Sequence, residues 1–207
     1  MIIPRIGSCI VGYFFGCFLT AEVVARRVAG KGACELGDTG NPGMANIMAS
    51  LGFKPGIYTL IGDLGKCVLA ALVSYLLFGR AGWIVTLYAG FGCTLGHDFP
   101  FWRRFQGGKG VATTSVGISI YSFPLGLAAN IAGMLVVFAT KYLCIGGPVI
   151  PFAFVLAMLA RGDQEAAAIS LALTVLSILS HGPAIMGIRK GTTKQTDVLA
   201  AIRKKVG

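Results

Sequence analysis

The sequence predicts an all-α integral membrane protein built as a polytopic bundle of about seven transmembrane helices. Of its 207 residues, 55% are hydrophobic and only 13% are charged, and the mean hydropathy is +0.77. A soluble domain would carry roughly twice that share of charged residues. Apolar runs follow one another along the whole chain and leave no room for a separate soluble domain. We therefore expect residues 1–207 to form a single membrane domain.

Seven apolar runs are candidate spans, since a helix needs about 20 residues to cross the hydrocarbon core. They cover residues 6–25, 57–78, 82–101, 111–123, 125–142, 148–160 and 165–181. The fourth and sixth runs are short, so five to seven spans are compatible with the sequence. A break between the fifth and sixth is expected near Gly146, Gly147 and Pro148. The first run is too long for a typical signal peptide and lacks an Ala-x-Ala cleavage site, so we interpret it as a transmembrane helix.

The basic residues predict the orientation of the chain. If seven spans begin outside, most of the 18 lysines and arginines fall in cytoplasmic loops, whereas only Arg5, Arg80 and Arg161 lie outside. This asymmetry is the positive-inside pattern of membrane proteins. We expect the N-terminus outside and the C-terminus in the cytoplasm. Topology and contact with anionic membrane lipids explain the net charge of +10, so no nucleic-acid partner is expected.

The first span carries two features that bear on packing. Gly12 and Gly16 have no side chain and allow close contact with another helix. Glu22 lies near the predicted cytoplasmic end of the span. We expect its carboxylate to pair with Arg26, which lies four residues further along the same helix.

The loop over residues 30–56 combines turn residues with a short helix. A Thr-Gly-Asn-Pro-Gly turn precedes a predicted helix over residues 44–51, which a glycine ends. Thr39, Asn41 and Asn46 offer neutral hydrogen-bonding groups near the start of this helix. They are candidates for binding a substrate, and capping of the helix is an equally open alternative.

The second span contains Asp63 and Lys66, three residues apart on one helix face. Ionisable residues at this depth usually pair and face the bundle, so we interpret them as a structural pair rather than a proton relay. The six cysteines lie mostly in apolar runs and include no Cys-x-x-Cys motif. We favour buried small residues over disulfides or a metal site for these positions.

The chain is organised around residues 96–114. This stretch begins with His97 at the end of the third span and continues through a cluster of aromatic residues and arginines. It ends in a segment that we call the glycine–lysine loop, which consists of Gly107, Gly108, Lys109 and Gly110. Glycines let backbone N–H groups approach an anion, the lysine adds a positive charge, and the following helix adds the positive end of its dipole.

The glycine–lysine loop therefore predicts a phosphate-binding site at the membrane surface. The alternative is a flexible turn whose lysine only sets the topology. The loop is not a P-loop, because position 103 is arginine and the residue after Lys109 is glycine rather than serine or threonine. A nucleotide-hydrolysing domain is thus not expected.

His181 stands at the predicted end of the last span, as His97 does at the end of the third. A lone histidine at a helix end is more often a cap or a dipole partner than a member of an active site. Two histidines at the same membrane face, beside a predicted phosphate site, favour a functional site. Two histidines alone make a poor metal site, so no metal is expected.

Two long motifs in the predicted cytoplasmic loops match a known family. Residues 96–100 read Gly-His-x-Phe-Pro, and residues 105–113 read Phe-x-Gly-Gly-Lys-Gly-Val-Ala-Thr. Residues 39–46 read Thr-Gly-Asn-x-Gly-x-x-Asn. In these motifs the chain resembles the PlsY family of bacterial acyl-phosphate:glycerol-3-phosphate acyltransferases, in which serine takes the place of Thr39. The resemblance covers nearly the whole chain, including the number and orientation of the spans.

Several positions depart from the family pattern. Ala49 stands where the family has an arginine, and Ala184 and Thr193 stand where it has asparagine and glutamate. These departures remove groups that the family would use to hold a substrate phosphate or hydroxyl. We expect Arg189 to offset the lost charge, because a guanidinium grips phosphate through two hydrogen bonds. The alternative is that Arg189 only holds the last helix to the anionic leaflet.

The resemblance implies transfer of a fatty acyl group from acyl phosphate to the 1-hydroxyl of glycerol 3-phosphate. The products would be lysophosphatidic acid and phosphate, in phospholipid biosynthesis. Acyl phosphate is already activated, so no cofactor is expected. The resemblance also implies the bacterial cytoplasmic (inner) membrane, with the active face toward the cytoplasm.

Lys109 is expected to offset charge on the leaving phosphate, His181 to polarise the acceptor hydroxyl, and Thr39 to orient substrate oxygens. No nucleophile and base pair is evident, so we expect direct transfer without an acyl-enzyme. The predicted substrate-binding residues are Gly40, Asn41, Asn46, His97, Gly107, Gly108, Gly110, Thr113 and Arg189.

Two alternative functions stay open at this point. A non-catalytic paralogue that binds a lipid precursor or a partner would fit the departures at Ala49, Ala184 and Thr193. A small membrane transporter would fit the ionisable residues Asp63 and Lys66 in the second span.

Overall fold

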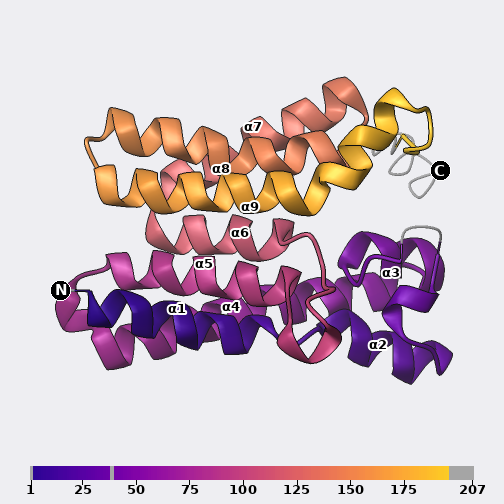
Figure 1. Ribbon diagram of the computed structural model, residues 1–207, viewed down its shortest axis with the longest axis horizontal. Coiled ribbons are helices and arrows are strands. Elements are labelled where there is room, and N and C mark those ends of the chain that lie inside the picture. Colours follow the sequence, from indigo (N-terminus) through magenta and orange to yellow (C-terminus); the bar gives the residue numbers. More distant parts are fainter. Residues whose placement is uncertain (1, 38–39, 196–207) are drawn as a thin grey trace. The chain divides into compact units, whose positions relative to one another are not determined.

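The computed structural model describes residues 2–37 and 40–195, and the regular elements of these ranges are all helices (Figure 1). The chain divides into two compact units, residues 1–121 and 122–207. Each unit has its own helix packing and is described by itself below. The all-α membrane fold that the sequence predicts is thereby confirmed.

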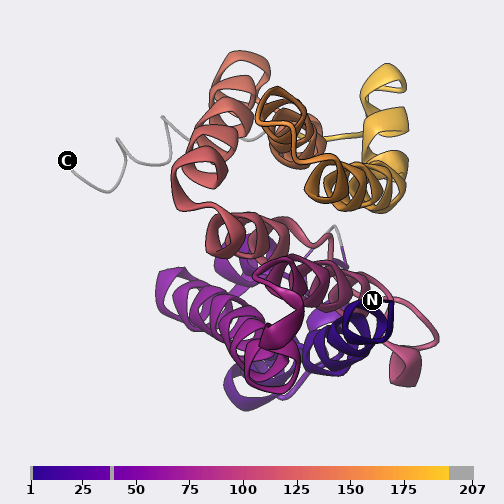
Figure 2. The same ribbon diagram turned by 90° about the vertical axis from the view of Figure 1, so that its left-hand side faces the viewer.

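The first unit contains six α-helices and three short 3-10 turns among the described residues. They are α1 Ile3–Gly16, α2 Thr20–Ala29, η1 Ala33–Glu35, α3 Met44–Leu51, α4 Phe53–Phe78, η2 Gly79–Ala81, α5 Ile84–Asp98, η3 Phe101–Arg103 and α6 Val111–Tyr121. Helix α5 lies at the centre, packed against α1, α4 and α6 (Figure 2). The predicted short helix over residues 44–51 is confirmed as α3.

Glycines bring α1 and α5 into close contact. A side chain at Gly12 or Gly16 of α1 would overlap the α5 backbone, and one at Gly92 or Gly96 of α5 would overlap the α1 backbone. The two backbones therefore touch along a strip of small residues, as is common between membrane helices. This contact holds the C-terminal end of α5, where His97 lies, against α1.

The first expected span is not one continuous helix, because the chain breaks between α1 and α2 at residues 17–19. A break exposes backbone carbonyls, which need donors at membrane depth. The indole Nε1 of Trp102 donates to the Cys17 carbonyl at 2.8 Å. The ammonium of Lys66 donates to the carbonyls of Gly16 and Phe18 at 3.2 and 2.8 Å. Side chains from elsewhere in the unit thus stabilise a bend that local sequence does not reveal.

The second unit is a three-helix arrangement of α7 Phe123–Thr140, α8 Leu143–Ala160 and α9 Gln164–Arg189. The expected break near Gly146, Gly147 and Pro148 is wrong, because these residues lie inside α8. The chain turns earlier instead, at Lys141, whose backbone is left-handed with φ of 62°. Gly146 serves helix packing rather than a turn, since a side chain there would overlap Val137 of α7.

The last helix extends further than expected. We predicted an end at His181, but α9 continues through Gly182 and Pro183 to Arg189. A proline inside a helix removes one backbone hydrogen bond, and the rest of the ladder continues on both sides of it. His181 is therefore a residue of the helix interior rather than of a helix end.

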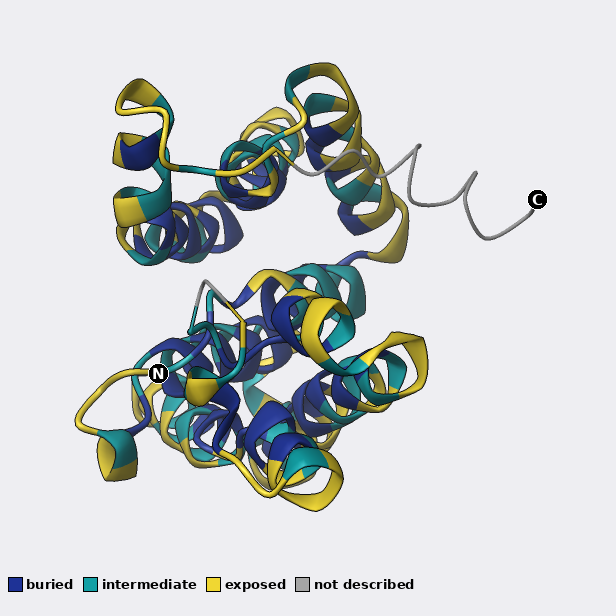
Figure 3. Ribbon diagram, turned by 90° about the vertical axis from the view of Figure 1, so that its right-hand side faces the viewer, coloured by how far each residue is buried: buried dark blue, intermediate teal, exposed yellow. Residues whose placement is uncertain are grey.

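Five helical stretches of the described chain are long and apolar enough to cross a membrane. They are Ile3–Ala29, Phe53–Ala81, Phe123–Thr140, Leu143–Ala160 and Gln164–Arg189. Helices α5 and α6, with 15 and 11 residues, are shorter. Large apolar side chains such as Leu76, Leu135 and Leu179 are exposed, as expected where lipid is the solvent. Figure 3 shows exposed positions, coloured yellow, along the helices of each unit. The count of seven spans and the orientation of the termini stay predictions.

Candidate active site

The glycine–lysine loop rests directly on the C-terminal end of α5. The backbone N–H of Gly108 donates to the carbonyl of His97 at 2.9 Å. A side chain at Gly107 would overlap that same carbonyl, and one at Gly108 would overlap the His97 imidazole at Nε2. Only glycine lets the loop approach this closely. The structure thus brings together three predicted substrate-binding residues, one histidine and two glycines.

The fourth residue of the loop, Gly110, forms the start of α6. Its backbone is left-handed, with φ of 63°, and its carbonyl accepts the first helical bond from Thr114 N–H at 2.9 Å. The buried hydroxyl of Thr113 donates to the same carbonyl at 3.0 Å and accepts from the Thr94 hydroxyl at 3.0 Å. Thr113 therefore shapes the loop, and its predicted contact with substrate stays a prediction.

Asp98 lies at the same place and was not singled out by the sequence analysis. Its side chain is buried, and its carboxylate lies against Gly110 at the N-terminal end of α6. The helix dipole favours a negative charge there. An anion bound at this loop would feel the negative charge of Asp98 as well, so the ammonium of the half-buried Lys109 carries more of the attraction. Binding of an anion at this loop should therefore depend more strongly on Lys109 than the sequence alone indicates.

A chain of buried polar side chains lies behind His97. The predicted Asp63 and Lys66 pair is confirmed, with 3.1 Å between Asp63 Oδ1 and Lys66 Nζ. Lys66 also lies 2.8 Å from His97 Nδ1, a contact that the sequence analysis missed. The three residues are 2%, 5% and 5% exposed, so this chain is closed to water. The sequence revealed the ionisable pair, because Asp63 and Lys66 stand out in an apolar helix. It contained no signal that His97 is the partner of this pair.

A second network fixes the turn before the loop. The predicted pair of Glu22 and Arg26 is confirmed at 2.8 Å, and Arg103 of η3 also donates to Glu22, at 2.7 Å. The second carboxylate oxygen accepts the backbone N–H of Ala33 at 2.9 Å as well. Arg103 further contacts Cys34 Sγ at 3.1 Å. Glu22 thus ties the loop after α2 to the turn that leads into the glycine–lysine loop.

The residues of the first loop have mixed outcomes. Asn46 is buried and donates from Nδ2 to the carbonyls of Leu36 and Ala33, at 2.9 and 3.3 Å. It holds the loop after α2 rather than capping its own helix. Gly40 has a left-handed backbone with φ of 56°, and Asn41 is half-buried beside it. Thr39 lies outside the described residues. The roles of all four in substrate binding stay predictions.

His181 and Arg189 belong to the second unit. The imidazole of His181 is buried, and its Nδ1 lies 2.8 Å from the Ser177 carbonyl. A carbonyl only accepts, so Nδ1 carries the proton and Nε2 of the neutral ring presents a lone pair. Arg189 is the exposed last residue of α9.

Two of the positions that depart from the resembled family contact each other. The hydroxyl of Thr193 donates to the carbonyl of Ala184 at 2.6 Å. This bond folds the segment after α9 back on the helix, together with the backbone bond from Thr192 N–H to the Gly187 carbonyl at 2.9 Å. The hydroxyl at position 193 therefore has a structural role, and its partner is a backbone carbonyl that does not depend on the side chain at 184.

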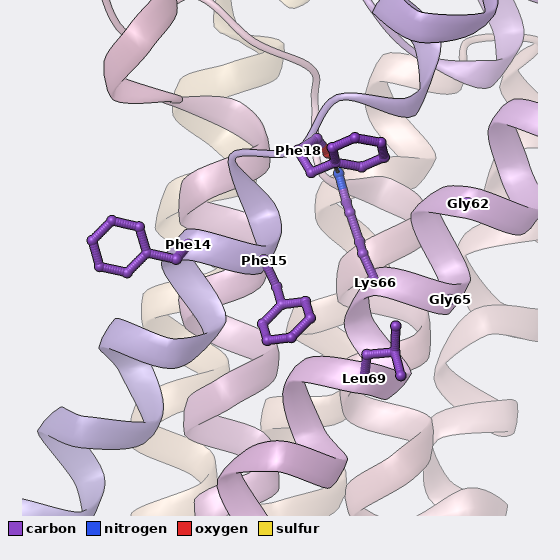
Figure 4. Close-up of a pocket in the computed structure, with 7 residues that line it drawn as sticks. All are labelled: Phe14, Phe15, Phe18, Gly62, Gly65, Lys66 and Leu69. Carbon is purple, nitrogen blue, oxygen red and sulfur yellow. Dashed lines mark hydrogen bonds between the residues drawn. The ribbon is translucent and has the colours of Figure 1, made fainter.

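An apolar groove of about 580 Å³ lies between α1 and α4 (Figure 4). Its lining is Phe14, Phe15, Phe18, Gly62, Gly65, Lys66 and Leu69. In Figure 4 the side chain of Lys66 runs along the groove toward Phe18. Because Lys66 bonds backbone carbonyls at its tip, the groove is apolar in character and suits a hydrocarbon chain.

Comparison with known proteins gives a consistent result. The model of a family described as glycerol-3-phosphate acyltransferase matches residues 6–191. Glycerol-3-phosphate acyltransferase 1 of Lactobacillus johnsonii is 37% identical over 200 residues, covering 97% of this chain and 96% of the relative. The glycerol-3-phosphate acyltransferase of Alkaliphilus metalliredigens is 31% identical over 191 residues, covering 90% and 93%.

A solved structure shares the fold. The crystal structure of PlsY (YgiH), an integral membrane glycerol 3-phosphate acyltransferase in its glycerol 3-phosphate form, matches with a TM-score of 0.82 at 24% identity. The match covers 96% of this chain and 98% of that one. The same protein in its lysophosphatidic acid form matches with a TM-score of 0.78 at 23% identity.

Proposed function

The chain belongs to the glycerol-3-phosphate acyltransferase family, and on this premise we propose that it transfers a fatty acyl group to the 1-hydroxyl of glycerol 3-phosphate. The donor is acyl phosphate, and the products are lysophosphatidic acid and phosphate. The reaction belongs to phospholipid biosynthesis at the bacterial inner membrane, with the active face toward the cytoplasm. Residues 1–207 act as one functional domain.

The observation that carries this proposal is the glycine–lysine loop on the end of α5. Two glycines bring the loop against His97, and Lys109 stands between Gly108 and the start of α6. Neither a bulky residue nor a neutral one would serve here, since a phosphate needs both close approach and positive charge. The loop therefore binds the phosphate that leaves the acyl donor.

The second step concerns the acceptor hydroxyl. In the neutral ring of His181, Nε2 carries the lone pair, because Nδ1 donates to the Ser177 carbonyl. Nε2 accepts the proton of the hydroxyl as its oxygen attacks the acyl carbon. The carbon–oxygen bond to phosphate breaks, and phosphate leaves with the electron pair. The ring later releases this proton to solvent, so it is restored without an acyl-enzyme.

The test is turnover of purified protein in detergent with palmitoyl phosphate and glycerol 3-phosphate, followed by release of inorganic phosphate. Lys109→Ala should reduce kcat by about 100-fold or more, which is the order of effect for losing a charge-stabilising donor. Lys54→Ala, at an exposed position in the first turn of α4, is the matched control and should stay within about threefold. Near-normal turnover of Lys109→Ala would refute the assigned role of the loop.

A further inference from the structure

The Nδ1 atom of His97 faces a group that only donates. Lys66 Nζ lies 2.8 Å from this nitrogen and 2.8 Å from the Phe18 carbonyl, with Asp63 at 3.1 Å. The carbonyls of Gly16 and Phe18 accept from this ammonium, and the carboxylate of Asp63 supplies the compensating charge that a buried ammonium needs. An ammonium has three N–H donors and no lone pair. Nδ1 of His97 must therefore accept, and the ring proton sits on Nε2.

The Nε2–H edge of His97 faces the glycine–lysine loop. A side chain built on Gly108 would overlap Nε2 itself, so this edge of the ring lies directly against the loop. Within residues 2–37 and 40–195, no group accepts a hydrogen bond from Nε2. The side chain of His97 is nevertheless mostly buried by its neighbours, with 6% of it exposed. A donor in a mostly buried ring is stabilised when a ligand accepts its hydrogen bond.

The loop itself lacks one donor that a phosphate site would use. The N–H of Gly108 is already bonded to the His97 carbonyl, so it is not available to an anion. The same histidine offers Nε2–H at the same glycine. The N–H of Gly108 is unavailable to a phosphate because it bonds the His97 carbonyl, and the Nε2–H of the His97 ring can donate in its place.

We propose that Asp63 and Lys66 are positioning residues that fix His97 as an Nε2–H donor to the phosphate group bound at the glycine–lysine loop. The inference rests on the proposed function for the identity of the ligand, which is the acyl-phosphate donor or inorganic phosphate. In this role Lys66 acts through His97, in addition to its bonds with the carbonyls of the bend. It orients the ring, selects its tautomer and leaves the proton on the nitrogen that faces the loop.

The first test determines the tautomer of His97 and does not require the protein to be enzymatically active. The sequence has only two histidines, so protein labelled with ¹⁵N in histidine gives two imidazoles, assigned through His181→Gln. We expect His97 protonated at Nε2, with a shift of that signal on titration with inorganic phosphate. A proton on Nδ1 of His97, or an Nε2 signal that does not respond to saturating phosphate, would overturn the proposal.

The second test uses two amides of different length at position 97. A glutamine nitrogen reaches about as far as Nε2, whereas an asparagine nitrogen stays near Nδ1. His97→Asn should reduce kcat/KM for palmitoyl phosphate by on the order of 10- to 100-fold, as expected for one hydrogen bond to a charged group. His97→Gln should recover most of that loss. Equal losses in the two variants, or none in either, would count against a donor at Nε2.

The third test separates His97 from the bend in the first helix. The double variant Asp63→Asn with Lys66→Met removes both buried charges together, so neither is left unpaired. We expect a mixture of His97 tautomers and a kinetic loss that is measurable but smaller than in His97→Asn, because part of the population keeps Nε2–H. Trp102→Phe is the control, because it removes a bond to the same bend without touching His97. If Trp102→Phe matches the double variant, the effect belongs to the bend and the proposal fails.

The outcomes distinguish this inference from the proposed function. If wild-type protein releases no phosphate from palmitoyl phosphate and glycerol 3-phosphate, the function is refuted while the labelled-histidine experiment still decides the tautomer and the phosphate contact. If turnover is normal and Nε2 is not protonated, only the role given to Lys66 and Asp63 is refuted.

Discussion

The two histidines of the chain have the same side chain in opposite hydrogen-bonding environments. His97, at the end of α5, has an ammonium at Nδ1, and His181, inside α9, has a carbonyl at Nδ1. Both are nearly closed to water, with 5% and 2% of the residue exposed. The first ring is thereby a donor at Nε2, and the second is an acceptor there. The chemical role of a buried histidine is thus set by the partner of its other nitrogen.

The surroundings of the two rings differ as well. His97 is held by side chains from α4 and by its backbone bond to Gly108, and its neighbouring turn is tied to α2 through Glu22 and Arg103. His181 bonds within its own helix, and the segment after α9 is held by Thr193. Long-range contacts therefore define the first region, whereas in the second the Nδ1 of His181 bonds a carbonyl of its own helix. Substitutions in the first should affect folding and chemistry together.

The largest expected effect comes from replacing His181, which accepts the proton of the attacking hydroxyl. His181→Gln and His181→Asn should each reduce kcat by about 100-fold or more, because neither amide takes up a proton. KM for palmitoyl phosphate should change little. At position 97 a glutamine should restore function, and at position 181 it should not. Steady-state phosphate release measures both, and rescue of His181 by glutamine would show that the ring only donates or accepts a hydrogen bond.

The next effect concerns stability of the first region. Glu22→Gln removes the charge that Arg103 and the Ala33 N–H share, so the free energy of unfolding should fall by about 1.5–3 kcal/mol. Arg26 contributes little to this loss, because its side chain is 68% exposed. Thermal unfolding in detergent measures the change.

The matched control for Glu22 is Glu35→Gln, at an exposed carboxylate that accepts one backbone bond from Gly32. It should lower stability by less than about 1 kcal/mol. Equal effects of the two substitutions would mean that the contact with Arg103 adds nothing to stability.

The smallest expected effect is at the end of α9. Arg189→Ala should raise KM for glycerol 3-phosphate by about 10-fold, the loss expected for one charge-assisted contact, and leave KM for palmitoyl phosphate unchanged. Lys190→Ala, at the next exposed position, is the control and should change neither constant. An equal rise of both KM values, or no rise, would reject Arg189 as the group that offsets the loss at Ala49.

Features that depend on local spacing were predicted from the sequence. The helix Met44–Leu51, the pair of Glu22 and Arg26, and the pair of Asp63 and Lys66 all follow from periodicity, turn residues and i, i+3 or i, i+4 neighbours. The glycine–lysine loop was also located, since glycines and a lysine between apolar runs form a local signal.

Features that depend on contacts between residues far apart in the chain were not predicted from the sequence. Lys66 and His97 are 31 residues apart, and Glu22 and Arg103 are 81 apart, so no local pattern joins them. The bend at residues 17–19 is invisible for the same reason, because its donors come from other helices. The predicted end of α9 was wrong because we applied the rule that proline ends a helix. The helical hydrogen bonds continue on both sides of Pro183 instead.

The bend between α1 and α2 has a consequence for how the chain is made. Its carbonyls at Gly16, Cys17 and Phe18 accept from the side chains of Lys66 and Trp102, which are 48 to 85 residues later in the chain. A ribosome delivers the first segment to the membrane long before those donors exist. Unsatisfied carbonyls in hydrocarbon cost several kcal/mol each, so the nascent segment is more stable as one straight helix. The bend then forms after α4 and the turn at residue 102 have been inserted, which makes it a late event in biogenesis.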